Sequence, residues 1–140
     1  MKKGLRILVM IVMILSMTAC IGDKSRVIET VKSIQTDRYE SYFKEDASDV
    51  SRIFACVFKT IIPEATWSDA IGKMKWEVER VTNDKNFYIT VSYKNATIKF
   101  LAVLNGDMVT IPNLDEAVVY YDGDTATLQQ LVLAMTIFGN

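Results

Sequence analysis

Apolar residues recur at helical spacing in the first half of the chain. One apolar stripe covers residues 24–35 and a second covers residues 50–61, which predicts two amphipathic helices. We expect Asp46 or Ser48 to cap the second helix, because both side chains accept backbone hydrogen bonds, and Pro63 to end it. Two shorter segments flank this helix, a turn-rich aromatic one at 38–44 and a loop or short helical turn at 64–73.

The middle of the chain changes to a period of two, which is typical of strands with one buried face. Strands are predicted at 74–79, 87–93, 98–104 and 108–111. Turns are predicted between them at Asn83-Asp84, Lys94-Asn95 and Asn105-Gly106. The strand at 98–104 is apolar on both faces, so we expect it to lie at the centre of the sheet.

Residues 113–121 leave two interpretations open. Asn113 and Glu116 have the spacing of a capping box and favour a helix, whereas the apolar pair Val118-Val119 favours a strand. The helix is the preferred prediction for this segment.

The end of the chain contains no charged side chain from residue 125 onward. Its spacing predicts a helix over 125–138 that is apolar nearly all round and must therefore be buried. We expect it to cover the outer sheet face at Leu101 and Val103, or to dock onto a partner or onto a second copy in a homodimer. The helices-first order followed by a strand meander predicts an α+β fold with an antiparallel sheet and a C-terminal apolar helix.

The N-terminus has the three parts of a secretory leader. Lys2, Lys3 and Arg6 precede an apolar run, and Ala19-Cys20 follows it. This arrangement resembles the lipobox of bacterial lipoproteins, with Met17 where leucine is usual. The resemblance implies that residues 1–19 are removed and that Cys20 carries fatty acyl chains such as palmitate.

The predicted organisation is therefore a leader at 1–19, an anchor and tether at 20–23, and one domain at 24–140. Two or more acyl chains hold a protein stably on a membrane, so we expect a location on the extracytoplasmic face of the cell membrane. The alternative is an ordinary secreted chain in which Cys20 forms a disulfide with Cys56, because an acylated sulfur cannot pair.

Charge and composition limit which partners and which catalytic or metal-binding groups we expect. Three of the sixteen basic residues lie within residues 1–19, so residues 20–140 carry 13 bases against 17 acids, a net charge of −4. This balance disfavours a nucleic-acid partner. The chain contains no histidine, which removes the commonest general base and metal ligand. We therefore expect no catalytic residues, no metal and no cofactor, and a protein or small molecule as the partner.

Several further residues are candidates for a functional site. Cys56 lies between Arg52 and Lys59 on the predicted second helix, so it is either a reactive thiol or a buried inert one. Glu77 and Glu79 share one strand face and are expected to be solvated. The segment Asp122-Gly123-Asp124 is expected to be a turn and not a calcium loop. Aromatic residues that could line a pocket are Tyr39, Tyr42, Trp67, Trp76 and Tyr88.

The stretch VKSIQTDRYESYF at residues 31–43 resembles small bacterial lipoproteins with a cystatin-like, nuclear-transport-factor-2-like domain. The resemblance covers residues 24–104 and implies N-terminal helices packed into the concave face of a curved sheet. Fold does not decide function. We expect a lipid-anchored, non-catalytic binding or interaction module near the membrane surface. The alternative is a structural or immunity-type surface lipoprotein that regulates a membrane neighbour without a ligand pocket.

Overall fold

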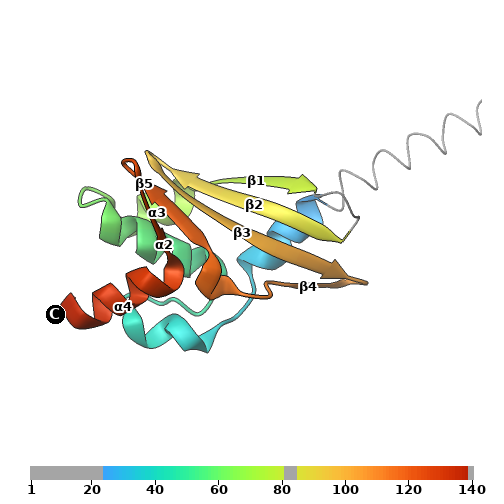
Figure 1. The fold of residues 1–140 in the computed structure, drawn as a ribbon, viewed down its shortest axis with the longest axis horizontal. Helices are drawn as coiled ribbons and strands as arrows, with labels where there is room; N and C mark the ends of the chain where they lie inside the picture. The colour runs from blue at the N-terminus through green and yellow to red at the C-terminus, as the bar shows by residue number, and fades with distance from the viewer. Residues whose placement is uncertain (1–23, 81–84, 139–140) are drawn as a thin grey trace, which may run out of the picture.

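The computed structural model describes residues 24–80 and 85–138, and these residues form helices packed against one antiparallel sheet (Figure 1). The helical segments at the start of the chain precede the sheet, which confirms the predicted mixture and order of helices and strands. The predicted leader, the lipidation site Cys20 and the turn at Asn83-Asp84 lie outside the described residues.

The helical layer begins with a helix at 24–32 and ends with α3 (Trp67–Lys73). Between them lie the 3-10 helix η1 (Asp37–Tyr42) and α2 (Val50–Ile61). The first helix is shorter than predicted because residues 34–36 are extended and pair with 48–50. Thr36 N–H donates to the carbonyl of Ser48 at 2.9 Å, and Val50 N–H donates to the carbonyl of Ile34 at 3.1 Å.

The N-cap of α2 is Asp49, so the prediction of Asp46 or Ser48 was wrong. Asp49 stands directly before the helix in an extended conformation, and its carboxylate accepts from Arg52 N–H at 2.9 Å. Asp46 lies too early in the chain for this and accepts from Ser48 N–H at 3.2 Å. The predicted end is confirmed, because α2 stops at Ile61, two residues before Pro63.

The sheet has six strands in the order β1-β2-β3-β5-β6, with β4 paired to β3 beyond the end of β5. Every pairing is antiparallel. β3 lies between β2 on one side and β5 and β4 on the other, so its predicted central place is confirmed. The strand bounds are β1 Lys75–Arg80, β2 Asn86–Tyr93, β3 Ala96–Asn105, β4 Met108–Thr110, β5 Val118–Tyr121 and β6 Asp124–Thr127.

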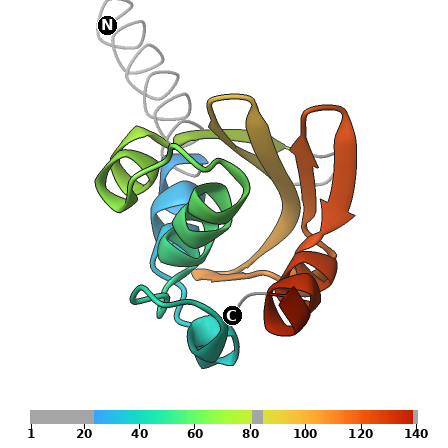
Figure 2. The same cartoon turned by 90° about the vertical axis from the view of Figure 1, so that its left-hand side faces the viewer.

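One face of the sheet packs on the helices, and Figure 2 shows the sheet curving around them. The inner positions of β2 and β3 alternate with exposed or half-buried outer ones, as a half-buried strand requires. Phe54 of α2 reaches across to Phe100 of β3 with ring centroids 5.2 Å apart. The buried residues of the described chain are of hydrophobic types, and they form one cluster between the helices and the sheet.

The helix predicted at 113–121 is wrong in its second half. Only the short 3-10 helix η2 (Leu114–Glu116) forms, and β5 follows it. Residues 118–121 form a strand because one flank of β3 is free there, and they pair with Ala96–Lys99 along their whole length. Asp122 and Gly123 both have positive φ and close a two-residue turn into β6.

The last helix, α4 (Leu128–Phe138), begins three residues later than predicted because 125–127 belong to β6. Thr127 and Gln130 then form a reciprocal cap. Gln130 N–H donates to Thr127 Oγ1 at 3.2 Å, and Thr127 N–H donates to Gln130 Oε1 at 3.0 Å.

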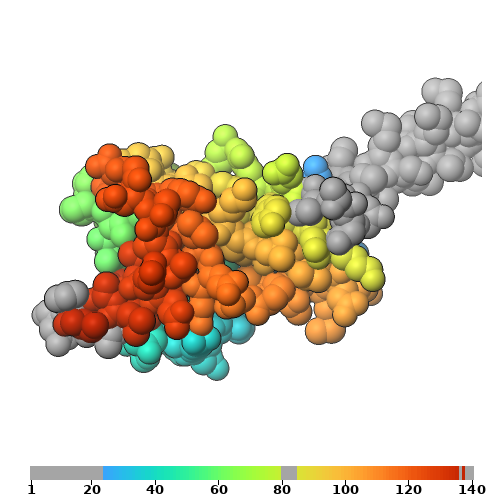
Figure 3. All heavy atoms as spheres, viewed as in Figure 1, coloured from blue at the N-terminus to red at the C-terminus, as the bar shows by residue number. Residues whose placement is uncertain are grey.

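The place of α4 differs from the expectation that it covers Leu101 and Val103. It packs at one end of the sheet against η1, η2 and β6 (Figure 1). Leu128 is fully buried, but Leu133 and Ile137 are 53% and 69% exposed. The outer sheet face therefore forms part of the molecular surface, where strand residues in yellow and orange lie uncovered in Figure 3. None of the helices in residues 24–80 and 85–138 has both the length and the apolar character that a membrane-spanning segment needs.

Candidate functional site

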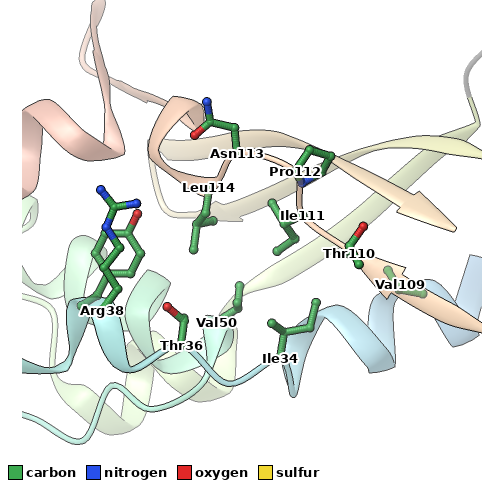
Figure 4. A pocket seen from close by; sticks show the side chains of 11 residues that line it. Ile34, Thr36, Arg38, Val50, Val109, Thr110, Ile111, Pro112, Asn113 and Leu114 are labelled. Atoms are coloured by element: carbon green, nitrogen blue, oxygen red, sulfur yellow. The ribbon is translucent and has the colours of Figure 1, made fainter. Parts of the chain in front are cut away.

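A hollow of about 380 Å³ opens between η1 and the chain that follows β4; we call it the mouth hollow (Figure 4). Ile111 and Leu114 point into it from one side, and Ile34 and Val50 face them from the other. Arg38 stands at one end. The lining residues are Ile34, Thr36, Arg38, Tyr39, Val50, Val109, Thr110, Ile111, Pro112, Asn113 and Leu114.

Local sequence explains why these walls face one another. The pairing of 34–36 with 48–50 turns the chain out of the first helix and presents Ile34 and Thr36 side by side. On the opposite wall, Pro112 cannot donate to a ladder, so the chain leaves β4 and enters η2 with Leu114 turned inward. An aliphatic slot results.

Polar chemistry gathers at Tyr39, Asp115 and Arg38. The Tyr39 hydroxyl donates to Asp115 Oδ1, and Arg38 Nη2 lies 2.7 Å from Asp115 Oδ2. These contacts join η1 to η2 across 76 positions of sequence. Burial, and then the hydrogen bond to Asp115, raises the pKa of Tyr39 well above its usual range, so the phenol stays protonated.

Of these three side chains, only that of Arg38 is largely exposed to solvent and therefore open to a ligand. Tyr39 is buried and the Asp115 side chain is 14% exposed, whereas the Arg38 side chain is 67% exposed. A guanidinium has five N–H donors in a fixed fork. The recorded ion pair uses one of its nitrogens, so others remain for a ligand group at the mouth.

The arrangement suits binding better than reaction chemistry. Arg38 supplies positive charge, Thr36 and Thr110 supply hydroxyls, and the aliphatic walls supply apolar contact. A phenol whose pKa is raised cannot act as a base near neutral pH. Within the part of the chain that the structure describes, no group of three His, Cys, Asp or Glu side chains is placed to hold a metal ion.

The five aromatic residues proposed as one pocket lining do not come together. Tyr39 lines the mouth hollow, and Tyr42 lines a separate hollow of about 270 Å³ beside Met135. Trp76 packs on Phe54 in the inner layer, with ring centroids 6.0 Å apart. Tyr88 lies on the outer sheet face, since its register partners are Glu79 and Leu101. Trp67 is half-buried at the start of α3.

Cys56 takes the buried alternative. Its exposed fraction is 4%, and it is a free thiol. Burial, with a smaller effect of Glu45, raises its pKa to about 12 against the opposing pull of Lys59. The thiolate that a reactive role needs is therefore disfavoured near neutral pH, despite the two flanking cations.

The remaining acidic candidates behave as solvated groups. Glu77 and Glu79 are exposed on the outer face of β1, and Lys75 Nζ lies 3.2 Å from Glu77 Oε1. Asp122 lies in the two-residue turn between β5 and β6, and Asp124 begins β6, so the predicted turn forms at this place.

Arg38 and Asp115 are site residues that the sequence pattern does not predict. Neither has a local signal, because their meeting depends on how η1 and η2 pack. The one available hint was Pro112, which breaks the strand pattern just before Asp115 and indicates that the chain leaves the sheet there.

Comparisons with known proteins give no match that bears on this site. No protein-family model matches the chain, and no match is found among curated proteins or among solved structures. The cystatin-like resemblance therefore stays a prediction, and the geometry of the mouth hollow is the basis for any functional conclusion.

Proposed function

We propose that this chain is a lipid-anchored lipoprotein of the cell envelope whose domain binds a small amphiphilic ligand in the mouth hollow. The proposal joins a sequence argument for the anchor at Cys20 with a structural argument for the site. The observation that carries the site is a hollow of about 380 Å³ with aliphatic walls and the exposed guanidinium of Arg38 at its edge.

The chemistry of the lining selects the ligand class. Apolar walls bury an apolar body, and a few polar groups fix its orientation. Arg38 favours an anionic end group, because guanidinium pairs with carboxylate by charge-assisted hydrogen bonds. The apolar lining and Arg38 therefore place the ligand in the hollow between η1 and η2, with its anionic end toward Arg38.

A titration with octanoate and octanol tests this binding role. The two molecules share a chain and differ in the anionic end group, so octanoate is expected to bind more tightly, with amide shifts at Ile111 and Leu114. Arg38→Gln should reduce octanoate binding about fivefold, which corresponds to the loss of one partly exposed ion pair.

Arg26→Gln is the matched control. Arg26 also pairs with one carboxylate at 2.8 Å, that of Asp107, but it does not line the mouth hollow. Equal binding of octanoate and octanol, or equal losses in the two arginine variants, would contradict the proposed site.

Mass spectrometry of membrane-derived protein tests the anchor separately. We expect an N-terminal peptide that begins at Cys20 and carries fatty acyl chains. Cys20→Ser should release the protein from the membrane, whereas Cys56→Ser should leave it attached. An unmodified thiol at residue 20 would refute the anchor while leaving the hollow untouched.

A second candidate function, a surface lipoprotein that regulates a membrane neighbour, is favoured by α4. Its exposed Leu133 and Ile137 offer an apolar contact to another protein or to a second copy. Leu133→Asp should leave octanoate binding unchanged and abolish this contact, which sedimentation velocity of the whole chain in detergent would detect as loss of a dimer.

A further inference from the structure

The sheet has a gap on one side of β3. β2 runs beside β3 along its length, but the other flank is shared by two strands. β5 pairs with Ala96–Lys99 and β4 pairs with Val103–Asn105. Between them, residues 100–102 have no strand beside them on this flank within the described chain.

The register shows which backbone groups face this gap. In an antiparallel pair, successive residues turn their N–H and C=O groups to alternate sides. Leu104 N–H donates to the carbonyl of Lys85 at 2.7 Å, so Leu104 faces the β2 side, and Ala102 and Phe100 do likewise. Leu101 therefore turns its N–H and C=O to the gap.

A second feature supports this assignment of even-numbered residues to the β2 side and odd-numbered residues to the gap. The Lys94-Asn95 turn joins β2 to β3 in a two-residue hairpin, whose closing pair, Tyr93 and Ala96, exchanges hydrogen bonds. Even-numbered residues of β3 thus face β2. Among the described residues, no loop or turn supplies a backbone hydrogen bond to Leu101.

A hollow of about 560 Å³ lies on the outer face at this point; we call it the outer hollow. Leu101, Lys99 and Tyr88 form one part of its lining, and Asn113 and Glu116 form another. Lys99 is exposed, and its Nζ lies 5.1 Å from the centroid of the Tyr88 ring. An unpaired donor and acceptor on a strand, a cation and an aromatic ring thus line one surface hollow.

The length of the gap limits what can pair there. A peptide strand laid along β3 would collide with β4 in one direction and β5 in the other. The gap accepts a single extended residue, which exchanges two hydrogen bonds with Leu101. A chain end meets this condition, because nothing has to continue past the residue that pairs.

The direction of pairing decides which end of a chain fits, because the lining holds both a cation, Lys99, and a carboxylate, Glu116. In antiparallel pairing the ligand carbonyl group meets Leu101 N–H, on the side of Leu101 that leads toward Lys99. We propose that the outer hollow captures the C-terminal residue of a peptide. Its carboxylate accepts from Leu101 N–H and pairs with Lys99, its amide N–H donates to the carbonyl of Leu101, and the preceding residues leave past Asn113. This site depends on neither the lipid anchor nor the mouth hollow.

The test is a titration of the whole ¹⁵N-labelled chain in detergent micelles. The probes are acetyl-trialanine with a free carboxylate and the same peptide with a C-terminal amide. We expect the acid to shift the amide resonance of Leu101, and the amide form to bind about fivefold more weakly because it loses the ion pair. Equal binding of the two peptides would overturn the proposal, as would an unmoved Leu101 resonance.

Two lysine variants sharpen the result. Lys99→Gln should reduce binding of the acid to that of the amide form. Lys94→Gln is the matched control, because Lys94 Nζ also lies over a tyrosine, 5.6 Å from the centroid of Tyr93, but at the far end of the hairpin. Equal loss in both variants would refute capture at Lys99. A shift of Leu101 with N-acetylglucosamine oligomers instead of the peptide acid would assign the hollow to glycans and reject the peptide.

Discussion

The contact between Tyr39 and Asp115 gives the sharpest stability prediction. Asp115→Ala removes the acceptor of a buried phenol and the partner of Arg38. An unpaired buried hydroxyl costs about 1–3 kcal/mol, and a partly exposed ion pair such as that of Arg38 contributes about 1 kcal/mol. We therefore expect Asp115→Ala to lower the free energy of unfolding by about 2–3 kcal/mol.

A double-mutant cycle separates the two contributions. Tyr39→Phe removes the hydroxyl itself, so adding it to Asp115→Ala should cost little more, and the coupling energy should be about 1–2 kcal/mol. Arg38→Gln alone should cost less than about 1 kcal/mol. Urea unfolding followed by circular dichroism measures these differences, and a loss of 2 kcal/mol moves the midpoint by about 1 M.

Additive single-mutant effects would refute this reasoning. Tyr39 lines the mouth hollow, so water that enters there is the physical alternative to Asp115 as an acceptor. If Asp115→Ala lowered the free energy of unfolding by less than about 0.5 kcal/mol, the change would be no larger than that of an ordinary surface substitution. The Tyr39 phenol would then not depend on the Asp115 carboxylate.

Three further outcomes follow from burial and register. The pKa of Cys56 is raised to about 12 from the unfolded value of 9.0, so the stability that the buried protonated thiol contributes is complete below pH 9 and is lost as the pH rises toward 12. Each pH unit in this range lowers the free energy of unfolding by about 1.4 kcal/mol. Cys56→Ala should therefore flatten the fall in the urea midpoint between pH 9 and 10. A flat wild-type profile there would contradict the buried protonated thiol. Leu128→Ala should cost about 2–5 kcal/mol in chemical unfolding because Leu128 is fully buried, whereas the exposed Leu133→Ala should change stability by less than about 0.5 kcal/mol; similar values would mean that α4 is not docked. In hydrogen exchange, the Leu101 amide should exchange faster than that of Phe100, and equal protection would remove the gap beside β3.

Local sequence carried most of the helix and strand assignments. Periods of 3.6 and 2 distinguish α2 from β1, β2 and β3, because apolar side chains must share the face that packs on the core. Turn residues marked the hairpins, since Gly106 and Lys94 adopt the positive φ that short turns require. The segment 118–121 was assigned wrongly because its apolar run fits a helix or a strand equally well.

The tertiary structure decided the rest. β5 became a strand because β3 offered a free flank, and α4 packed at the end of the sheet because 124–127 were taken into β6. The mouth hollow depends on Tyr39 and Asp115, whose separation in sequence hides their contact. The gap at Leu101 depends on where two other strands end. Such features arise from the meeting of distant segments, and periodicity along one segment carries no information about which segment it will meet.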